Sequence, residues 1–172
     1  MLIVFSGLPG TGKTTLAKAL ATQLEAVYLR IDSIEQALRN SGTLRREVGS
    51  SGYQVANAMA LDNLKMGRRV IADCVNPVAE SRQAWADTAA LAGCALLNVQ
   101  IICSDLDRHR QRVESRISDV PGLVLPDWRS VTAHEYESWT QAPLTVDTAQ
   151  LSTDVALALL IEHVTAAIKN RA

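Results

Sequence analysis

A glycine-rich segment near the amino terminus constrains the fold of this chain more than any other feature. Residues 7–14 read GLPGTGKT, which matches the pattern GxxxxGK followed by serine or threonine. In this pattern the glycines let backbone N–H groups turn inward around phosphate oxygens, and a lysine and a hydroxyl stand at the start of a helix. The segment therefore predicts a P-loop, which holds the phosphates of a nucleotide, rather than a plain glycine-rich turn.

The residues on either side of this segment predict the strand and the helix that a P-loop requires. Residues 2–5 form a continuous apolar run, as expected for a strand that is buried on both faces. Within residues 13–25 leucines recur every four positions, which predicts a helix with one apolar stripe. The residues expected to bind the nucleotide are those of the loop and the first helical turn: Gly7, Leu8, Pro9, Gly10, Thr11, Gly12, Lys13, Thr14 and Thr15.

Two side chains of the segment have predicted chemical roles of their own. Lys13 should reach the β- and γ-phosphates and act in catalysis, and Thr14 should ligate Mg²⁺, so the expected cofactors are ATP and Mg²⁺. The amino terminus of the helix adds a partial positive charge. GTP stays open as the nucleotide, because the sequence has no Asn-Lys-x-Asp segment for reading guanine, yet that lack does not identify adenine.

Strands and helices are predicted to alternate along the rest of the chain. The further strands are expected at residues 27–31, 70–72, 96–103 and 144–146, with the later helices at 53–66, 80–91 and 153–169. This alternation predicts an α/β fold in which helices cover both faces of a five-stranded parallel sheet, with ligands at the carboxyl ends of the strands. We expect one domain over residues 1–172, with a short mobile lid around residues 105–128.

Composition disfavours several classes of protein and partner. With 48% apolar residues and a formal charge of -1, the chain is suited to a buried core and has no general attraction for nucleic acid. Its three cysteines include no CxxC pair, which favours a reducing cytoplasm over a disulfide framework. The longest late apolar stretch is interrupted by Glu162 and His163, so no membrane span is expected.

Polar residues follow three of the predicted strands, where they bear on the type of reaction. Asp32 follows the second strand, Asp73 and Asn76 follow the third, and Arg112 and Arg116 lie on the helix after the fourth. These residues matter because a P-loop alone does not separate kinases from GTPases, motors and transporters.

With these residues in place, the chain resembles the small P-loop kinases related to chloramphenicol phosphotransferase, zeta toxins and the polynucleotide kinase domain. The resemblance is carried by GLPGTGKTT, by Asp32, by the segment DCVNP at residues 73–77 with Arg82 after it, and by the arginine-bearing helix. It implies a P-loop NTPase three-layer α/β/α sandwich with strand order 2-3-1-4-5. It also implies ATP-dependent transfer of the γ-phosphoryl group to a hydroxyl of a small molecule.

The resemblance also implies roles for the polar residues. Asp32 would be the general base at the acceptor hydroxyl, and Asp73 would meet the Mg²⁺ water shell or the substrate. Asn76 would help to shape the same substrate pocket. Arg112 would flank the adenine, and Arg116 would reach the phosphates as a catalytic residue.

Each role has a structural alternative. Asp32 could be only the N-cap of the helix that it opens, and Asp73 a cap before Pro77, since both residue types favour such junctions. The arginines at positions 108, 112 and 116 recur every four residues, which is equally typical of a solvated helix face. Cys74 is expected to be a buried thiol rather than a nucleophile.

Departures from the family pattern bear on the acceptor. Polynucleotide kinases of this superfamily place a basic residue three positions after the strand-two aspartate, where this chain has Glu35, so a nucleic-acid hydroxyl is disfavoured. Antibiotics, sugars and other metabolites stay open. Trp128, Tyr136 and Trp139 either line the acceptor pocket or pack under the lid. The alternative to a kinase is a nucleotide-binding switch or slow ATPase without an acceptor.

Overall fold

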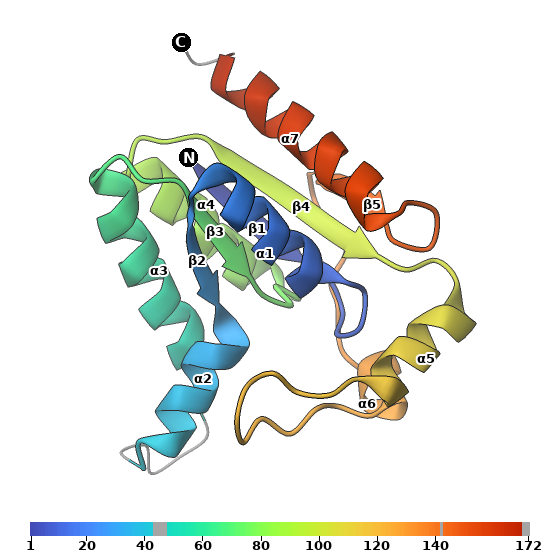
Figure 1. Cartoon of the computed structure of the whole chain (residues 1–172). Helices are drawn as coiled ribbons and strands as arrows, with labels where there is room; N and C mark the ends of the chain where they lie inside the picture. The colour runs from blue at the N-terminus through green and yellow to red at the C-terminus, as the bar shows by residue number, and fades with distance from the viewer. Residues whose placement is uncertain (43–47, 142, 170–172) are drawn as a thin grey trace.

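A five-stranded parallel sheet forms the centre of the molecule (Figure 1). The structure is a computed structural model, and it describes residues 1–42, 48–141 and 143–169. The strands lie in the order β2-β3-β1-β4-β5, which confirms the expected order. In chain order they are β1 (Leu2–Ser6), β2 (Val27–Arg30), β3 (Val70–Asp73), β4 (Leu96–Ile102) and β5 (Leu144–Asp147).

The described residues form the helices α1 (Lys13–Leu24), α2 (Ile31–Asn40), α3 (Ser51–Lys65), α4 (Ala79–Leu91), α5 (Leu106–Ser115), α6 (Trp128–Thr132) and α7 (Thr153–Lys169). Of these, α1 and α7 cover one face of the sheet, and α3 and α4 cover the other. The alternation of side chains along β1 explains the two layers, because successive residues of a strand point to opposite faces. Ile3 and Phe5 pack with α1 and α7, whereas Leu2 and Val4 pack with α3 and α4.

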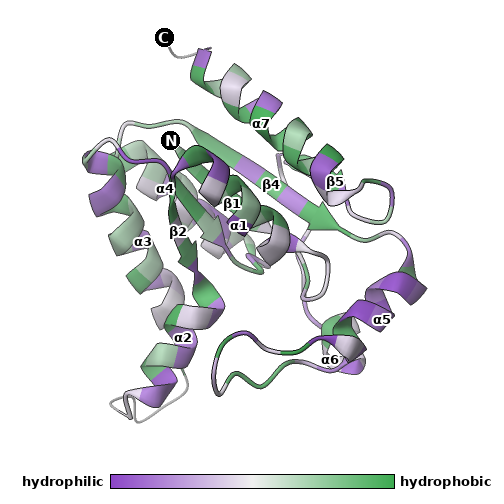
Figure 2. Cartoon of the chain, in the orientation of Figure 1, coloured by the Kyte–Doolittle hydropathy of each residue, from purple (hydrophilic) through white to green (hydrophobic). Residues whose placement is uncertain are grey.

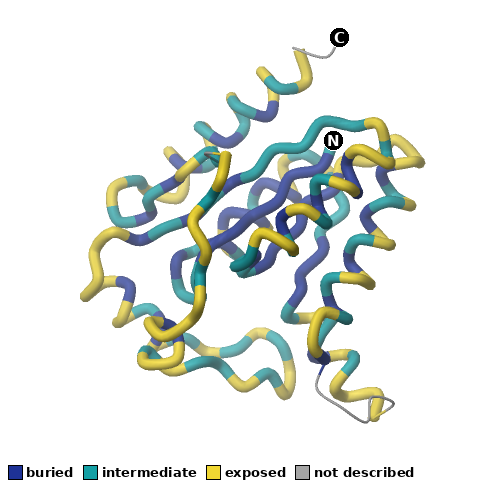
Figure 3. Tube along the Cα trace, turned by 180° about the vertical axis from the view of Figure 1, so that it is seen from behind, coloured by how far each residue is buried: buried dark blue, intermediate teal, exposed yellow. Residues whose placement is uncertain are grey.

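The sheet with its covering helices differs in hydropathy and burial from the segment beyond the carboxyl ends of the strands, which consists of α5 and the loop 116–127. In Figure 2 the strands are largely apolar, with hydrophilic bands in β4, whereas α5 is largely hydrophilic. Figure 3 shows the central strands buried, and no residue of the loop 116–127 between α5 and α6 is buried. This loop and α5 occupy the place of the expected lid. Among the described residues, no helix is both long and apolar enough to cross a membrane.

The register of the parallel strands brings polar side chains to one edge of the sheet. Asp73 of β3 pairs with Phe5 of β1 on one side and with Arg30 of β2 on the other. Since all strands are parallel, their carboxyl ends meet at the edge where β1 continues into the P-loop. The helix α2 begins at Ile31, directly after β2, so Asp32 lies in its first turn at this same edge.

Candidate active site

The P-loop joins β1 to α1 and is held in shape by its own hydrogen bonds. The ammonium of Lys13 donates to the Leu8 carbonyl oxygen at 2.7 Å, and the hydroxyl of Thr11 donates to the same oxygen at 2.8 Å. The backbone N–H of Gly7 donates to the Val75 carbonyl oxygen at 3.0 Å. The loop is therefore tied both to itself and to the segment that follows β3.

Two glycines of the loop are required by close contacts as well as by backbone conformation. Gly7 has a φ of +136°, and a Cβ atom there would lie 2.2 Å from the Ile101 carbonyl oxygen. Gly10 has a φ of +83°, and a Cβ atom there would lie 2.5 Å from Cγ2 of Val113 on α5. Any side chain at these positions would add steric conflict to a backbone conformation that L-residues disfavour.

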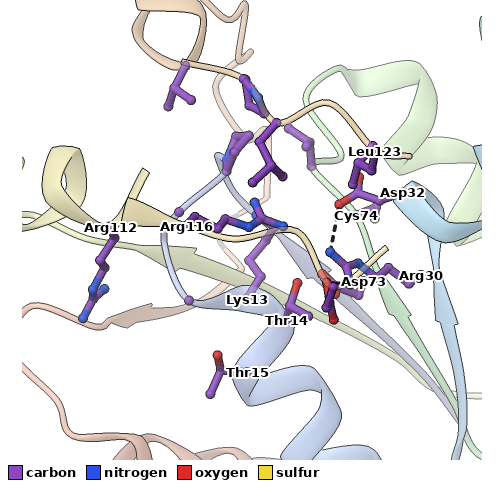
Figure 4. Close-up of a pocket in the computed structure, with 18 of the residues that line it drawn as sticks. Lys13, Thr14, Thr15, Arg30, Asp32, Asp73, Cys74, Arg112, Arg116 and Leu123 are labelled. Carbon is purple, nitrogen blue, oxygen red and sulfur yellow. Dashed lines mark hydrogen bonds and ion pairs between the residues drawn. The ribbon is translucent and has the colours of Figure 1, made fainter. Parts of the chain in front are cut away.

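One cavity of about 1110 Å³ lies at the carboxyl ends of the strands. The P-loop, the ends of β2 and β3, α5 and the loop 116–127 all contribute to its wall (Figure 4). Ten of the predicted site residues line it: Pro9, Gly10, Gly12, Lys13, Thr14, Thr15, Asp32, Asp73, Arg112 and Arg116. Gly7, Leu8, Thr11 and Asn76 are not among its lining residues.

Lys13 is a buried cation in the floor of this cavity, with 8% of its surface exposed. Burial lowers the pKa of its ammonium, and the carboxylates of Asp73 and Asp32 act in the opposite direction. In Figure 4 the side chain of Arg116 reaches over Lys13, and its positive charge also lowers the lysine pKa. Two cations held this close together favour an anion between them.

Two carboxylates face the cavity from adjacent strand ends, in different surroundings. Asp73 is buried, and its Oδ2 accepts a hydrogen bond from the hydroxyl of Tyr28 at 2.7 Å. Asp32 is 41% exposed, and its Oδ2 accepts from Nη2 of Arg30 at 3.4 Å. The N-cap residue of α2 is Arg30, and no side chain caps the helix. The alternative that Asp32 serves only as an N-cap is therefore wrong.

The oxygen atoms near the P-loop fit a magnesium ion that is carried by a nucleotide. Thr14 and Asp73 both line the cavity (Figure 4). The described residues contain no cluster of three or more His, Cys, Asp or Glu side chains able to hold a metal by themselves. A hydroxyl and a carboxylate leave most of an octahedral shell to water and phosphate, as Mg²⁺ prefers.

The arginines of α5 have different environments. Arg112 donates to Oγ1 of Thr148 at 2.7 Å, and that hydroxyl donates to the Thr11 carbonyl oxygen at 2.8 Å, so α5 is tied to the P-loop through Thr148, the residue after β5. Arg108 also lines the cavity and donates to the Ala149 carbonyl oxygen at 3.2 Å. Arg110 lies outside the cavity and pairs with Glu114. The face with four-residue spacing is therefore the one turned to the cavity.

A sequence comparison identifies the family. A family described as an AAA domain matches residues 2–133. This chain belongs to that AAA domain family. A search of curated proteins finds no match to the sequence.

Solved structures similar to this AAA domain chain share its fold over almost its whole length. A candidate kinase from Chloroflexus aurantiacus is 24% identical with a TM-score of 0.75, and 96% of each chain is covered. The APS kinase of Mycobacterium tuberculosis in complex with AMPPNP and APS is 19% identical with a TM-score of 0.69, covering 95% of this chain and 96% of that one. A gluconokinase from Sinorhizobium meliloti is 18% identical with a TM-score of 0.60, covering 95% and 94%. The expected kinase-like P-loop fold is thereby confirmed.

Asn76, which was predicted to shape the substrate pocket, is fully buried in this AAA domain. Its Nδ2 donates to the hydroxyl of Ser6 at 3.0 Å, and its Oδ1 accepts from the hydroxyl of Ser81 at 2.8 Å. Its backbone has a φ of +52°, a left-handed conformation that asparagine tolerates. Asn76 therefore positions the turn after β3, and we no longer expect it to contact the substrate.

The three aromatic residues considered for the pocket wall are not among the residues that line the cavity. The guanidinium of Arg82 lies 4.2 Å from the ring centroid of Trp139 and 5.1 Å from that of Tyr136. Arg82 also donates to the carbonyl oxygens of Asn76, Pro77, Glu137 and Ser138. Trp128 packs edge to face on His109 with centroids 5.1 Å apart. Trp128 therefore supports α5, and Tyr136 and Trp139 support the turn after β3 through Arg82.

Three cavity-edge contacts were missed by sequence reasoning. They are the hydrogen bond from Tyr28 to Asp73, the ion pair of Arg30 with Asp119 at 2.7 Å, and the ion pair of Lys18 with Asp119 at 2.6 Å. Arg30 stands at the end of a buried strand, and this position indicated that its guanidinium would need a partner such as Asp119. Nothing near Asp119 in the sequence indicated its partners, because they lie about a hundred residues away along the chain.

Proposed function

We propose that this protein is an ATP-dependent kinase that transfers the γ-phosphoryl group to a hydroxyl of a small molecule. The observation that carries the proposal is the arrangement around one cavity. Lys13 of the P-loop, Asp32 and Asp73 at adjacent strand ends, and Arg116 of the lid all line it. Phosphoryl transfer requires this combination of phosphate cradle, cations and a carboxylate at the acceptor, because its catalysis consists mainly of positioning and charge neutralisation.

The donor half of the site would be the P-loop with its two cations. Backbone N–H groups of the loop and Lys13 would hold the β- and γ-phosphates, and the ammonium would leave the Leu8 carbonyl for them. Thr14 and Asp73 would hold Mg²⁺, which would neutralise phosphate charge when bound with the nucleotide. Arg116, whose side chain reaches over Lys13 in Figure 4, would stabilise negative charge on the transferring group. Removing one such donor typically costs about 10²–10³ in kcat.

The acceptor half would lie beside Asp32. This carboxylate is accessible, at 41% exposure, so an acceptor hydroxyl could donate a hydrogen bond to it and be oriented for in-line attack. As the bond from the acceptor oxygen to the γ-phosphorus forms, the bond from that phosphorus to the β,γ-bridging oxygen would break and ADP would leave, while the hydroxyl proton would pass to Asp32. Asp73 is less suited to this role, because it is buried and already accepts the Tyr28 hydrogen bond.

Similarity to known kinases supports a small-molecule acceptor. The APS kinase and the gluconokinase that share the fold carry small-molecule acceptors in their names. Nucleic acid remains the less favoured acceptor, given Glu35 and the formal charge of -1. The free thiols of Cys74, Cys94 and Cys103 support a cytoplasmic location.

A nucleotide-dependent switch is the second candidate. It is favoured by the contacts of the lid loop with the body, where Asp119 pairs with both Arg30 and Lys18. A nucleotide that rearranged these contacts would alter the exposed surface of the loop without any transfer of phosphate.

ATP turnover in the presence of hydroxylated compounds tests both candidates. The kinase predicts stimulation by one class of acceptor with a phosphorylated product, and Asp32→Asn should lose most of that stimulated rate while still binding AMPPNP. Asp62→Asn is the matched control, since Asp62 is exposed on α3 and lies outside the cavity. Full stimulated turnover in Asp32→Asn would refute the base assignment. Background turnover with every acceptor, combined with nucleotide-dependent binding of a partner, would favour the switch.

A further inference from the structure

The guanidinium of Arg30 is buried at the cavity edge with few partners. Its side chain is 3% exposed, although it stands at the end of β2 among the residues that line the cavity. Nη1 donates to Oδ1 of Asp119 at 2.7 Å, and Nη2 donates to Oδ2 of Asp32 at 3.4 Å. Within the described residues its Nε is buried and has no hydrogen-bond partner.

These contacts use only part of what the side chain offers. A guanidinium has five N–H donors in a planar fork, and a buried one is normally matched by a bidentate carboxylate or phosphate. Arg30 has one short hydrogen bond, one long one and a buried donor without a partner. Arg30 can therefore donate more hydrogen bonds to an anion than it donates to Asp119 and Asp32.

The short hydrogen bond comes from the lid rather than from the body. Asp119 lies in the loop 116–127 and is 50% exposed, and its carboxylate sits between Arg30 of β2 and Lys18 of α1. Hydrogen bonds from Lys18 and then from Arg30 hold the pKa of this carboxyl well below its usual range. The carboxylate of Asp119 thus occupies an anion site that is formed by Arg30 and Lys18, and in this structure the chain itself supplies the anion.

The neighbouring charges favour an anion once Asp119 leaves. Arg30, Lys18, Asp32 and Asp119 sum to zero, and without Asp119 the remaining three sum to +1. Glu35 is already paired with Arg39 at 3.1 Å. Asp73 acts electrostatically on Arg30, but its Oδ2 accepts from Tyr28 and its charge is offset by that of the buried Lys13, so the local sum without Asp119 stays at +1. Asp119 is half-exposed, and its pair with Lys18 is exposed on both sides, so its carboxylate can return to water when a ligand anion takes its place on the buried Arg30.

We propose that the acceptor carries an anionic group, a carboxylate or a phosphate, which replaces Asp119 on Arg30. This inference rests on the proposed kinase function and specifies its substrate class. An anion on Arg30 would lie next to Asp32, which is two residues further along the chain and within hydrogen-bonding distance of the same guanidinium. The acceptor would thereby be anchored by its charge, with a hydroxyl a few bonds away beside the base.

The test uses full-length protein saturated with AMPPNP and Mg²⁺, so that the P-loop is occupied before any anion is added. Calorimetric titration with glycerol 3-phosphate, glycerate and glycerol compares a phosphate, a carboxylate and a neutral hydroxyl compound. We expect at least one of the two anions to bind and glycerol not to bind. Arg30→Met should weaken anion binding by about tenfold or more, as the loss of a charge-assisted hydrogen bond does. Asp119→Asn should strengthen it by roughly two- to fivefold, because the internal competitor is weakened.

Two further variants test whether the effect is specific to the guanidinium of Arg30. Arg39→Met is the matched control, since Arg39 also lines the cavity but is 46% exposed and pairs with Glu35; it should leave anion binding unchanged. Arg30→Lys keeps the positive charge but loses the planar guanidinium, so its affinity for anions should lie between those of wild type and Arg30→Met. This variant keeps the inference testable if Arg30→Met folds poorly.

Three results would overturn the inference. They are equal binding of glycerol and both anions, equal losses in Arg30→Met and Arg39→Met, and weaker anion binding in Asp119→Asn, which would make Asp119 a permanent part of the site. Failure of wild-type protein to bind AMPPNP would instead refute the proposed nucleotide site. A protein that binds AMPPNP but shows no preference for anions would refute the anionic acceptor alone.

Discussion

The contact between the P-loop and α5 can be tested with one added methyl group at Gly10. Alanine at this position places its Cβ 2.5 Å from Cγ2 of Val113 and 3.3 Å from Cδ2 of His109, both on α5. Neither neighbour is the end of a flexible side chain, because Val113 is buried and His109 is held by a 2.8 Å hydrogen bond to the Pro9 carbonyl. We therefore expect the methyl group to push α5 away from the loop.

The free-energy cost of Gly10→Ala has two parts, and comparison with Gly67→Ala distinguishes them. The left-handed φ of +83° costs an alanine about 1–2 kcal/mol, and the overpacked contact costs about 1–3 kcal/mol more. Gly67 has a φ of +76° and no atom within 4 Å of its added Cβ, so Gly67→Ala carries the first cost alone. The difference between the two variants, about 1–3 kcal/mol in the free energy of unfolding, measures the contact itself.

Urea unfolding followed by circular dichroism gives this difference, and calorimetry with AMPPNP gives its consequence for the site. Gly10→Ala should bind AMPPNP more weakly than Gly67→Ala, because α5 carries Arg112 and positions Arg116, the residue that follows its last turn. Adding Val113→Ala removes the clashing Cγ2 atom, so the double variant should be more stable than the sum of the single effects predicts. The reasoning fails if Gly10→Ala and Gly67→Ala unfold with equal free energies and bind AMPPNP equally well.

Two further predictions concern buried cations. The AMPPNP affinity of wild type should fall as pH rises through a value below the usual lysine pKa of 10.5, because burial lowers the Lys13 pKa and the neutral amine must take up a proton to bind phosphate. Calorimetry over that pH range should show weak, pH-independent binding for Lys13→Met; an identical pH profile in both proteins would contradict the assignment. Arg82→Met should lose at least about 2 kcal/mol of unfolding free energy, because it frees the carbonyls of residues 76, 77, 137 and 138. Arg110→Met, which changes an exposed pair, is the control, and equal unfolding by urea would contradict the structural role.

Local signals were sufficient for the framework of the site. The glycines and the lysine of residues 7–14, the apolar run before them and the leucine spacing after them all act within about 25 residues, and they correctly predicted strand, loop and helix. The positions of Asp32 and Asp73 at adjacent strand ends also followed, because parallel strands bring their carboxyl ends together. Local sequence could not show that α2 begins ahead of Asp32 and makes it a first-turn residue rather than a cap.

What the amino-acid sequence determined by itself, therefore, is the phosphate loop and the order of strands and helices, because these depend on backbone conformation and on the periodicity of neighbouring residues. The tertiary structure alone decided which polar side chains serve the cavity. Arg82 and Asn76 are buried and hold backbone and side chains around the turn after β3, whereas Arg30 donates a hydrogen bond to Asp119, 89 residues away along the chain. Such pairings arise only when the packing of the whole domain removes side chains from water and the burial of each charge demands a partner.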